Sequence, residues 1–155
     1  MRRILVTGMS ATGKSSALAK LAQRGFRTVD TDEPGWTLED AEGGRWWDEE
    51  RIGRLLAEDG PTLYVSGTVS NQGRFYDRFD AVVLLSAPAE VLLQRIATRT
   101  TNDWGKSGEE RQLILGHIRE VEPLLRATCT HEVDAELPLP EVVRRLVEIA
   151  QEAGS

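Results

Sequence analysis

The stretch Gly8-Met9-Ser10-Ala11-Thr12-Gly13-Lys14-Ser15 is the strongest indicator of the fold of this chain. An apolar run precedes it at residues 4–6, and a helical pattern follows it at residues 15–24. A glycine-rich turn between a strand and a helix lets backbone N–H groups curl around phosphate oxygens, and the positive end of the helix points at them. The stretch therefore predicts a phosphate-binding loop, with a nucleoside triphosphate such as ATP as the bound cofactor.

Two side chains of this loop have separate tasks in such a site. We expect Lys14 to reach the β- and γ-phosphates and Ser15 to supply a ligand to Mg²⁺. The alternative is a chance glycine-rich turn, which the strand before it and the helix after it disfavour. The predicted nucleotide contacts are Gly8, Ser10, Ala11, Thr12, Gly13, Lys14, Ser15, Ser16, Arg95 and Arg99.

Size and composition limit the class of protein. The 155 residues, of which 40% are hydrophobic and 28% charged, fit one domain over residues 1–155. The net charge of -6 disfavours non-specific binding to nucleic acid. No apolar stretch approaches the roughly 20 residues that span a bilayer, so we expect no membrane partner. The single cysteine, Cys129, excludes an internal disulfide and suits a reducing cytoplasm, and we expect a monomer or a dimer.

Strand and helix patterns alternate along the chain. Apolar or β-like runs predict strands at residues 4–6, 26–29, 63–65, 81–85 and 131–133. Apolar residues at three-to-four spacing predict helices at residues 15–24, 46–58, 89–99, 109–127 and 140–152. This order predicts an α/β domain of βα repeats with right-handed crossovers.

Two aspartates follow the second predicted strand, in Asp30-Thr31-Asp32. Ligands bind outside the carboxyl ends of parallel strands, so we expect these carboxylates to face the γ-phosphate. We predict that Asp30 holds Mg²⁺ and that Asp32 orients or deprotonates an acceptor hydroxyl. The alternative is an aspartate-rich turn that runs into Pro34-Gly35. The third strand ends in Ser66-Gly67-Thr68 without an acidic residue, where a metal ligand would usually stand. This absence favours a functional role for the two aspartates.

These motifs make the chain similar to the small P-loop kinases, and most closely to the shikimate kinase-like branch of the adenylate kinase superfamily. The matching motifs are the phosphate loop, Asp30-Thr31-Asp32, Ser66-Gly67, residues 82–87 before a helix with Arg95 and Arg99, and Glu122-Pro123-Leu124-Leu125 before a last strand. The resemblance implies a three-layer P-loop fold with a five-stranded parallel sheet in the order 2-3-1-4-5, flanked by helices. It also implies a turn at Pro123 and Leu124, where Leu125 replaces the family's aromatic residue.

A basic helix end precedes the loop at residues 100–106. Arg95 and Arg99 lie four residues apart there, and guanidinium groups on a closing loop can neutralise the charge of a transferring phosphate. We therefore expect a lid at about residues 99–108. The alternative, above all for Arg95, is a solvated helix end that complements the helix dipole. The predicted catalytic residues are Lys14, Asp30, Asp32 and Arg99.

The acceptor side is less specific. We expect an acceptor-binding region at about residues 31–60, together with the loop after the third strand, where amides and an arginine can bind a polar molecule. Gly67-Thr68-Val69 stands where shikimate kinases have a run of glycines, so the resemblance does not fix the substrate. His117 and His131 do not have the spacing of metal ligands. The predicted substrate contacts are Asp32, Arg45, Gly67, Asn71 and Gln72.

These features predict ATP- and Mg²⁺-dependent phosphoryl transfer to a small metabolite, either a nucleoside monophosphate or a polyol-like hydroxyl acceptor. The alternative is a nucleotide-binding or NTP-hydrolysing regulatory protein without a small-molecule acceptor. Such a switch would show an acidic metal ligand after the third strand and a water-orienting glutamine nearby, for which Gln72 is a distant candidate. Acceptor-dependent release of ADP distinguishes the two functions.

Overall fold

A parallel sheet forms the centre of the chain, of which the computed structural model describes residues 2–42, 44–99 and 107–153. In spatial order the sheet contains β2 (Arg27–Asp30), β5 (Leu63–Ser66), β1 (Arg3–Thr7), β6 (Ala81–Ser86) and β7 (His131–Asp134). Counted along the chain, these five strands have the order 2-3-1-4-5 that the resemblance implied. Because every neighbouring pair is parallel, Thr7, Asp30 and Ser66 come to the same edge of the sheet.

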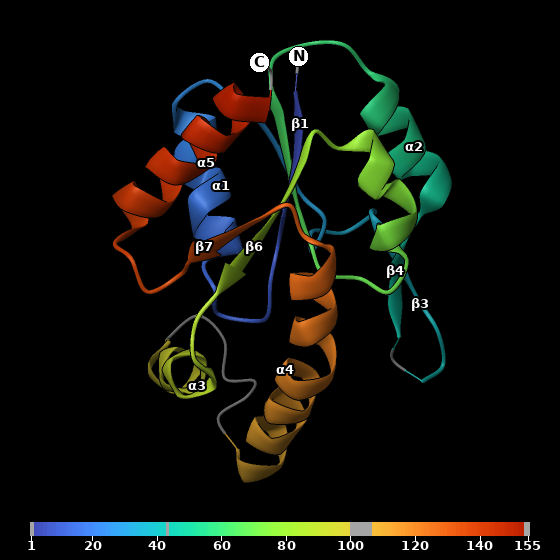
Figure 1. Cartoon of the computed structure of the whole chain (residues 1–155). Coiled ribbons are helices and arrows are strands. Elements are labelled where there is room, and N and C mark those ends of the chain that lie inside the picture. Colours follow the sequence, from blue (N-terminus) through green and yellow to red (C-terminus); the bar gives the residue numbers. More distant parts are fainter. Residues whose placement is uncertain (1, 43, 100–106, 154–155) are drawn as a thin grey trace.

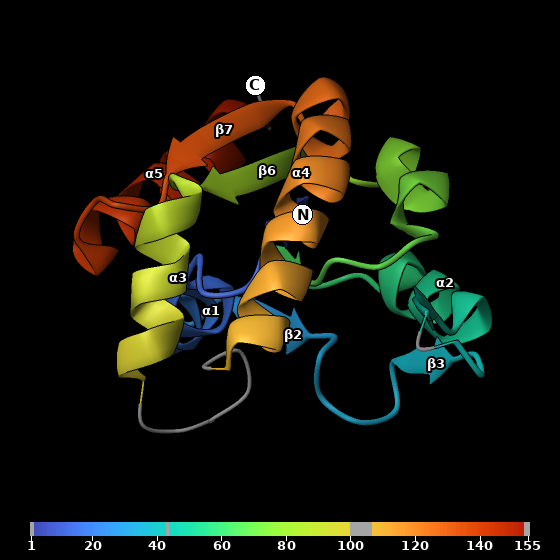
Figure 2. The same ribbon diagram turned by 90° about the horizontal axis from the view of Figure 1, so that it is seen from below.

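Helices cover both faces of this sheet (Figure 1). One face carries α1 (Lys14–Gln23) and α5 (Leu139–Ala153), and the other carries α2 (Glu49–Ala57) and the 3-10 helix η1 (Gln72–Arg78). Two further helices, α3 (Ala89–Thr98) and α4 (Gly108–Thr128), lie beyond the carboxyl ends of the strands (Figures 1 and 2). The predicted three-layer α/β P-loop fold is confirmed.

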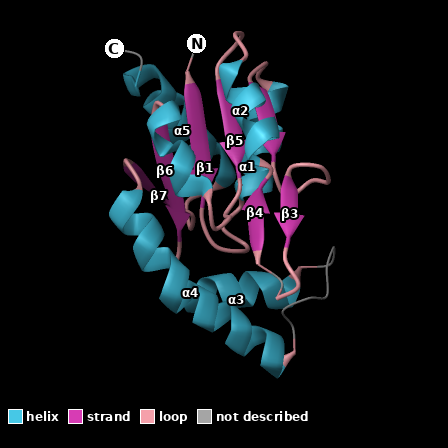
Figure 3. Ribbon diagram, turned by 90° about the vertical axis from the view of Figure 1, so that its right-hand side faces the viewer, coloured by secondary structure: helices cyan, strands magenta, loops and turns pink. Residues whose placement is uncertain are grey.

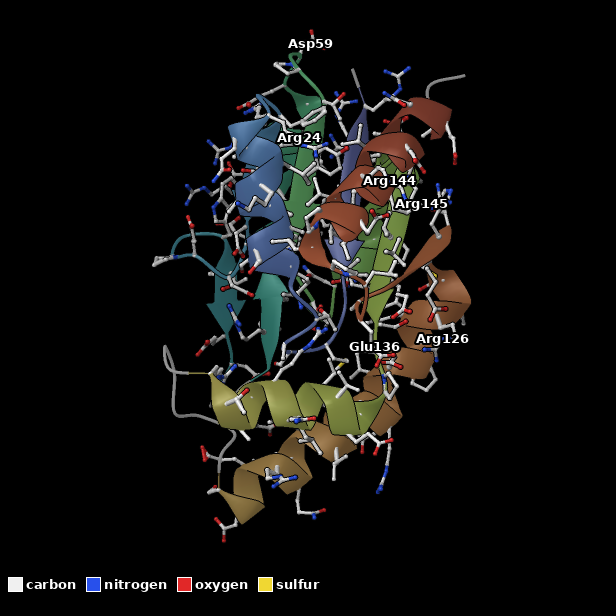
Figure 4. All side chains as sticks on the ribbon, turned by 90° about the vertical axis from the view of Figure 1, so that its left-hand side faces the viewer. Arg24, Asp59, Arg126, Glu136, Arg144 and Arg145 are labelled. Atoms are coloured by element: carbon white, nitrogen blue, oxygen red, sulfur yellow. The ribbon has the colours of Figure 1, made fainter. Side chains whose placement is uncertain are left out.

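The two edges of the sheet can be told apart in Figure 4. Arg126, near the end of α4, and Glu136, after β7, lie at the carboxyl edge beside α3 and α4. Asp59, in the turn before β5, lies at the opposite edge. The residues that follow the strands therefore gather on the side of α3 and α4.

Strands buried on both faces explain the continuous apolar runs of the sequence. In β1, Ile4 and Val6 pack in the core cluster that includes α1 and α5, whereas Leu5 packs in the cluster of α2 and η1. All three side chains are fully buried. On β5, the hydroxyl of Tyr64 donates to the carbonyl oxygen of Leu146 at 3.0 Å, and burial raises the pKa of Tyr64 to about 12.

The helix predicted for residues 46–58 is wrong at its beginning. Trp46 and Trp47 belong to β4 (Arg45–Trp47), which pairs antiparallel with β3 (Thr37–Glu39) in a hairpin outside the central sheet (Figure 3). The helix α2 begins only at Glu49, because the extended Asp48 accepts a hydrogen bond from the backbone N–H of Arg51 at 3.2 Å and caps it. The hairpin therefore forms part of the predicted acceptor-binding region.

The turn that the resemblance implied at Pro123 and Leu124 is also wrong, since α4 continues through Pro123. Ile118 before it and Leu125 after it are both buried in one core cluster, and this packing outweighs the hydrogen bond that proline cannot donate. Among the described residues, no helix combines the length and apolar character of a membrane span.

Candidate active site

The phosphate loop connects β1 to α1 in a conformation that depends on its small residues. Gly8, Ala11 and Gly13 have positive φ angles of 153°, 68° and 91°. A Cβ atom on Gly8 would lie 2.5 Å from the carbonyl oxygen of Leu85, so no larger residue fits there. The helix α1 begins after Gly13 without a side-chain cap or an acidic residue in its first turn. Its N–H groups and its positive end are thus suited to an anion.

Lys14 folds back over this loop. Its Nζ donates to the carbonyl oxygens of Gly8 at 2.7 Å and Met9 at 3.0 Å, and the side chain is half-buried. Burial lowers the pKa of Lys14 to about 8, although the carboxylates of Asp32 and Asp30 act in the opposite direction. The two carbonyl oxygens carry only partial negative charges and therefore compensate the Lys14 ammonium group in part. A bound phosphate would supply a full negative charge close to it.

The hydroxyl side chains of the loop differ in their surroundings. Thr12 is buried, and its Oγ1 donates to the carbonyl oxygen of Met9 at 2.8 Å, so it stabilises the loop itself. Ser10, Ser15 and Ser16 are exposed. These serines can therefore reach a nucleotide, whereas the Thr12 hydroxyl is already hydrogen-bonded within the loop.

Ser15 and Asp30 form the part of the site that fits a metal ion. The Ser15 hydroxyl donates to Asp30 Oδ2 at 2.6 Å, and the backbone N–H of Asp32 donates to Asp30 Oδ1 at 3.0 Å. In the part of the chain that the structure describes, no group of three or more His, Cys, Asp or Glu side chains could hold a metal ion. Mg²⁺ commonly takes one or two protein oxygens and fills its other positions with water and phosphate oxygens, so this pair fits it.

Asp32 lies next to the hairpin of β3 and β4. Arg45 of β4 has Nη1 3.7 Å from Asp32 Oδ1 and Nε 3.6 Å from Glu39 Oε1, and its Nη2 donates to Thr37 Oγ1 at 3.3 Å. These contacts are longer than close ion pairs, and 38% of the Arg45 side chain is exposed. The guanidinium group can therefore exchange them for an anionic group on a substrate.

Asn71 and Gln72, two predicted substrate contacts, have partners within the protein. Asn71 accepts a hydrogen bond from the backbone N–H of Trp47 at 2.8 Å and donates to its carbonyl oxygen at 3.1 Å. Gln72 is buried, and its Nε2 donates to the hydroxyls of Thr7 at 3.1 Å and Tyr76 at 2.9 Å. The structure places both amides near the acceptor region, and their contact with a substrate stays a prediction.

Gly67, a third predicted substrate contact, lies against a buried hydrogen bond. Trp47 Nε1 donates to Thr31 Oγ1 at 2.9 Å, and a Cβ atom on Gly67 would lie 2.2 Å from that hydroxyl oxygen. The sequence placed Trp47 in the acceptor-binding region but on a helix, and it gave no role of its own to Thr31, which stands between the two aspartates. The signal that could have found Thr31 is a hydroxyl residue directly after a strand of the parallel sheet, at the end of the strand where ligands bind.

Thr68 is another residue of the site that the sequence did not single out. Its hydroxyl donates to the carbonyl oxygen of Gly8 at 2.6 Å and accepts from the Gly8 backbone N–H at 3.2 Å. Its oxygen also lies 3.1 Å from the hydroxyl oxygen of Thr7. Thr68 thus fixes the first glycine of the phosphate loop to the segment after β5.

Arg95 joins the phosphate loop to the segment after β7. Its guanidinium group donates to the carbonyl oxygens of Ala11 at 3.1 Å and Ala135 at 2.6 Å. Arg99 caps the end of α3, with its backbone N–H donating to the Arg95 carbonyl oxygen at 3.1 Å. Residues 100–106 of the predicted lid lie outside the described residues. The structure thus brings Arg95 to the loop and leaves the lid a prediction.

The sequence of the chain matches a known family. A family model described as an AAA domain matches residues 4–116, which include the phosphate loop, both aspartates and the hairpin. The chain belongs to the AAA domain family. A search of the curated proteins finds no match to this chain.

Solved structures of small kinases share the fold of this AAA domain chain over nearly its whole length. Shikimate kinase from Acinetobacter baumannii, in complex with shikimate, has a TM-score of 0.66 at 15% identity, covering 98% of this chain and 94% of that one. A gluconokinase from Sinorhizobium meliloti 1021 has a TM-score of 0.64 at 25% identity, with coverages of 99% and 94%. A sugar kinase from Janibacter sp. HTCC2649 has a TM-score of 0.60 at 21% identity, with coverages of 99% and 98%. The resemblance to the small P-loop kinases is confirmed.

Proposed function

We propose that this protein transfers the γ-phosphoryl group of ATP, with Mg²⁺, to a hydroxyl group of a small metabolite. The observation that carries the proposal is the position of Asp30. Its carboxylate accepts hydrogen bonds from Ser15 of the phosphate loop and from the backbone of Asp32, whose own carboxylate lies 3.7 Å from Arg45. One short segment therefore joins a nucleotide side to an acceptor side.

On the nucleotide side, each residue has a task that suits phosphoryl transfer, which depends mainly on positioning and charge neutralisation. Lys14 would bind the β- and γ-phosphates, and Ser15 and Asp30 would hold Mg²⁺. When bound, Mg²⁺ would neutralise negative charge on the phosphate oxygens. Arg95 would keep the loop in place against the segment after β7, and Arg99 would bring positive charge from the lid.

On the acceptor side, Asp32 suits a hydroxyl better than a phosphate. An attacking hydroxyl must lose a proton, which a carboxylate can accept, whereas a phosphate acceptor is already anionic and would be repelled by it. Arg45 can hold an anionic group on the same metabolite. We therefore favour a polyol-like acceptor, in line with the gluconokinase and sugar kinase structures, over a nucleoside monophosphate.

The proposal extends to the whole chain. We assign residues 1–155 to one kinase domain, with an acceptor-binding region at about residues 31–60 and a lid at about residues 99–108. We infer that the protein acts in the cytoplasm as a monomer or a dimer, on a small-molecule substrate, without a nucleic-acid or membrane partner.

Release of ADP from Mg-ATP tests this function with a panel of D-gluconate, shikimate, uncharged polyols and AMP. We expect release above background with a hydroxy acid, and no stimulation by AMP. Replacing Asp32 with Asn should lower the stimulated rate by about a hundredfold, because the proton acceptor is lost. The matched control is Glu33→Gln, which changes the exposed neighbouring acid. Release that no acceptor stimulates would favour the regulatory alternative.

A further inference from the structure

A buried chain of hydrogen bonds passes through Thr31, the residue that stands between the two aspartates of the site in the sequence. The backbone N–H and the hydroxyl of Thr31 both donate to the carbonyl oxygen of Ser66, at 3.0 Å and 2.7 Å. The same hydroxyl accepts from Trp47 Nε1 at 2.9 Å. An indole N–H can only donate, and a hydroxyl has one proton, so the direction is fixed from Trp47 through Thr31 to Ser66.

This chain of bonds leaves no space for a side chain at Gly67. A Cβ atom there would lie 2.2 Å from Thr31 Oγ1 and 3.4 Å from Trp47 Nε1. Thr31 and Trp47 are both fully buried. These hydrogen bonds therefore connect the end of β2, the end of β5 and the hairpin at one buried position. An unpaired polar group at this position would lower the free energy of unfolding.

Trp47 is itself held firmly in the protein. The side-chain amide of Asn71 binds both its backbone N–H and its carbonyl oxygen, at 2.8 Å and 3.1 Å. The indole ring packs against Phe75 and Phe79, with ring centroids 5.8 Å and 6.5 Å away. The indole N–H is therefore a fixed point toward which Thr31 is oriented.

The two neighbours of Thr31 are the two carboxylates of the site. Asp30 reaches Ser15 at 2.6 Å, and Asp32 lies 3.7 Å from Arg45, which stands two residues before Trp47 on the same strand. A change in the backbone at Thr31 would move both carboxylates relative to the phosphate loop.

We propose that Trp47 is a positioning residue, which acts through Thr31 to fix Asp30 and Asp32 against the phosphate loop. This inference rests on the proposed function, because it assumes that Ser15 and Asp30 hold Mg²⁺ on a nucleotide. Loss of the indole N–H should weaken the metal-dependent part of nucleotide binding and leave the part that depends on the phosphate loop alone.

Calorimetric titration with the non-hydrolysable ATP analogue AMP-PNP tests the positioning role, with Mg²⁺ and again with EDTA. In Trp47→Phe and in Thr31→Val, we expect the strengthening of binding by Mg²⁺ to fall about three- to tenfold, the equivalent of one hydrogen bond. Affinity in EDTA should stay within about twofold, because the loop itself is unchanged. The double variant should lose no more than the larger single loss, since both changes break the same bond.

The packing control is Phe75→Leu, which removes an aromatic neighbour of Trp47 without touching Thr31. It should lower the melting temperature and keep the full effect of Mg²⁺. The positioning role is overturned if Trp47→Phe keeps that effect, or if Phe75→Leu loses it equally. Failure of the wild-type protein to bind AMP-PNP at all would instead refute the proposed function, and the positioning role with it.

Hydrogen exchange of the Trp47 indole N–H, followed by NMR, tests the bond without any nucleotide. We expect slow exchange in the wild-type protein and at least about tenfold faster exchange in Thr31→Val, where the N–H has lost its acceptor. Equal exchange rates in the two proteins would overturn the inference.

Discussion

Replacing Lys14 with Met should stabilise the ligand-free protein while it removes nucleotide binding. Burial lowers the pKa of Lys14 from its ordinary 10.5 to about 8, which costs the folded state about 3 kcal/mol while the lysine is protonated. Methionine has a similar length and no charge to desolvate. Because the lysine keeps some solvent contact and its two hydrogen bonds are lost, we expect a net gain of about 1–2 kcal/mol, or about 2–8 °C in melting temperature.

The stability gained by Lys14→Met should depend on pH, because the folded and unfolded chains release the Lys14 proton at different pH values. Between pH 8 and 10.5 the unfolded chain keeps the Lys14 proton and the folded protein loses it, so the stability of the wild-type protein rises with pH in this window. The gain from Lys14→Met should therefore be full below pH 8 and should disappear as the pH approaches 10.5. Denaturant unfolding at pH 7, 9 and 10 measures the difference.

The matched control is Lys20→Met, since Lys20 is an exposed lysine of the same helix. Its effect on the free energy of unfolding should stay within about 0.5 kcal/mol. AMP-PNP with Mg²⁺ should raise the melting temperature of the wild-type protein and of Lys20→Met, but not that of Lys14→Met. The reasoning is refuted if Lys14→Met melts at or below the wild-type temperature at pH 7. It is also refuted if the difference in free energy of unfolding between Lys14→Met and the wild-type protein is the same at every pH.

Three further changes test other parts of the structure. Replacing Gly67 with Ala puts a Cβ atom 2.2 Å from Thr31 Oγ1 and should cost about 1–3 kcal/mol in denaturant unfolding; Gly73→Ala, with nothing within 4 Å, should cost far less, and equal losses would contradict the contact. The pKa of Tyr64, raised to about 12, means that the unfolded chain releases its proton first as the pH rises above about 10, so stability should fall by about 1 kcal/mol between pH 9 and 11. Tyr64→Phe should abolish the part of this fall in stability that Tyr64 causes, and an unchanged fall in the variant would contradict the raised pKa of Tyr64. Asp30→Asn should raise the Mg²⁺ concentration for half-maximal ADP release about tenfold and keep AMP-PNP binding in EDTA, whereas an unchanged Mg²⁺ requirement would show that Asp30 is not on the metal side.

Some parts of the candidate site could be predicted because they depend on spacing within a short segment. Lys14 and Ser15 follow their glycines at fixed positions, and the strand and helix on either side come from local patterns. The boundaries of the hairpin could not be predicted in this way. The Trp46 and Trp47 pair fits the start of a helical pattern, and the choice depends on the Asp48 cap and on what the indole of Trp47 meets inside the protein.

Local sequence patterns predict that a strand, a phosphate loop and a helix begin an alternating α/β chain, because periodicity and glycine chemistry act between near neighbours. The contacts of Asp30 with Ser15 and of Thr31 with Trp47 arise only when the chain is folded. These partners lie 15 and 16 residues apart in the chain. Their contact depends on the β2 and β5 register and on a hairpin folded against it, and no local pattern encodes how separate segments approach one another in space.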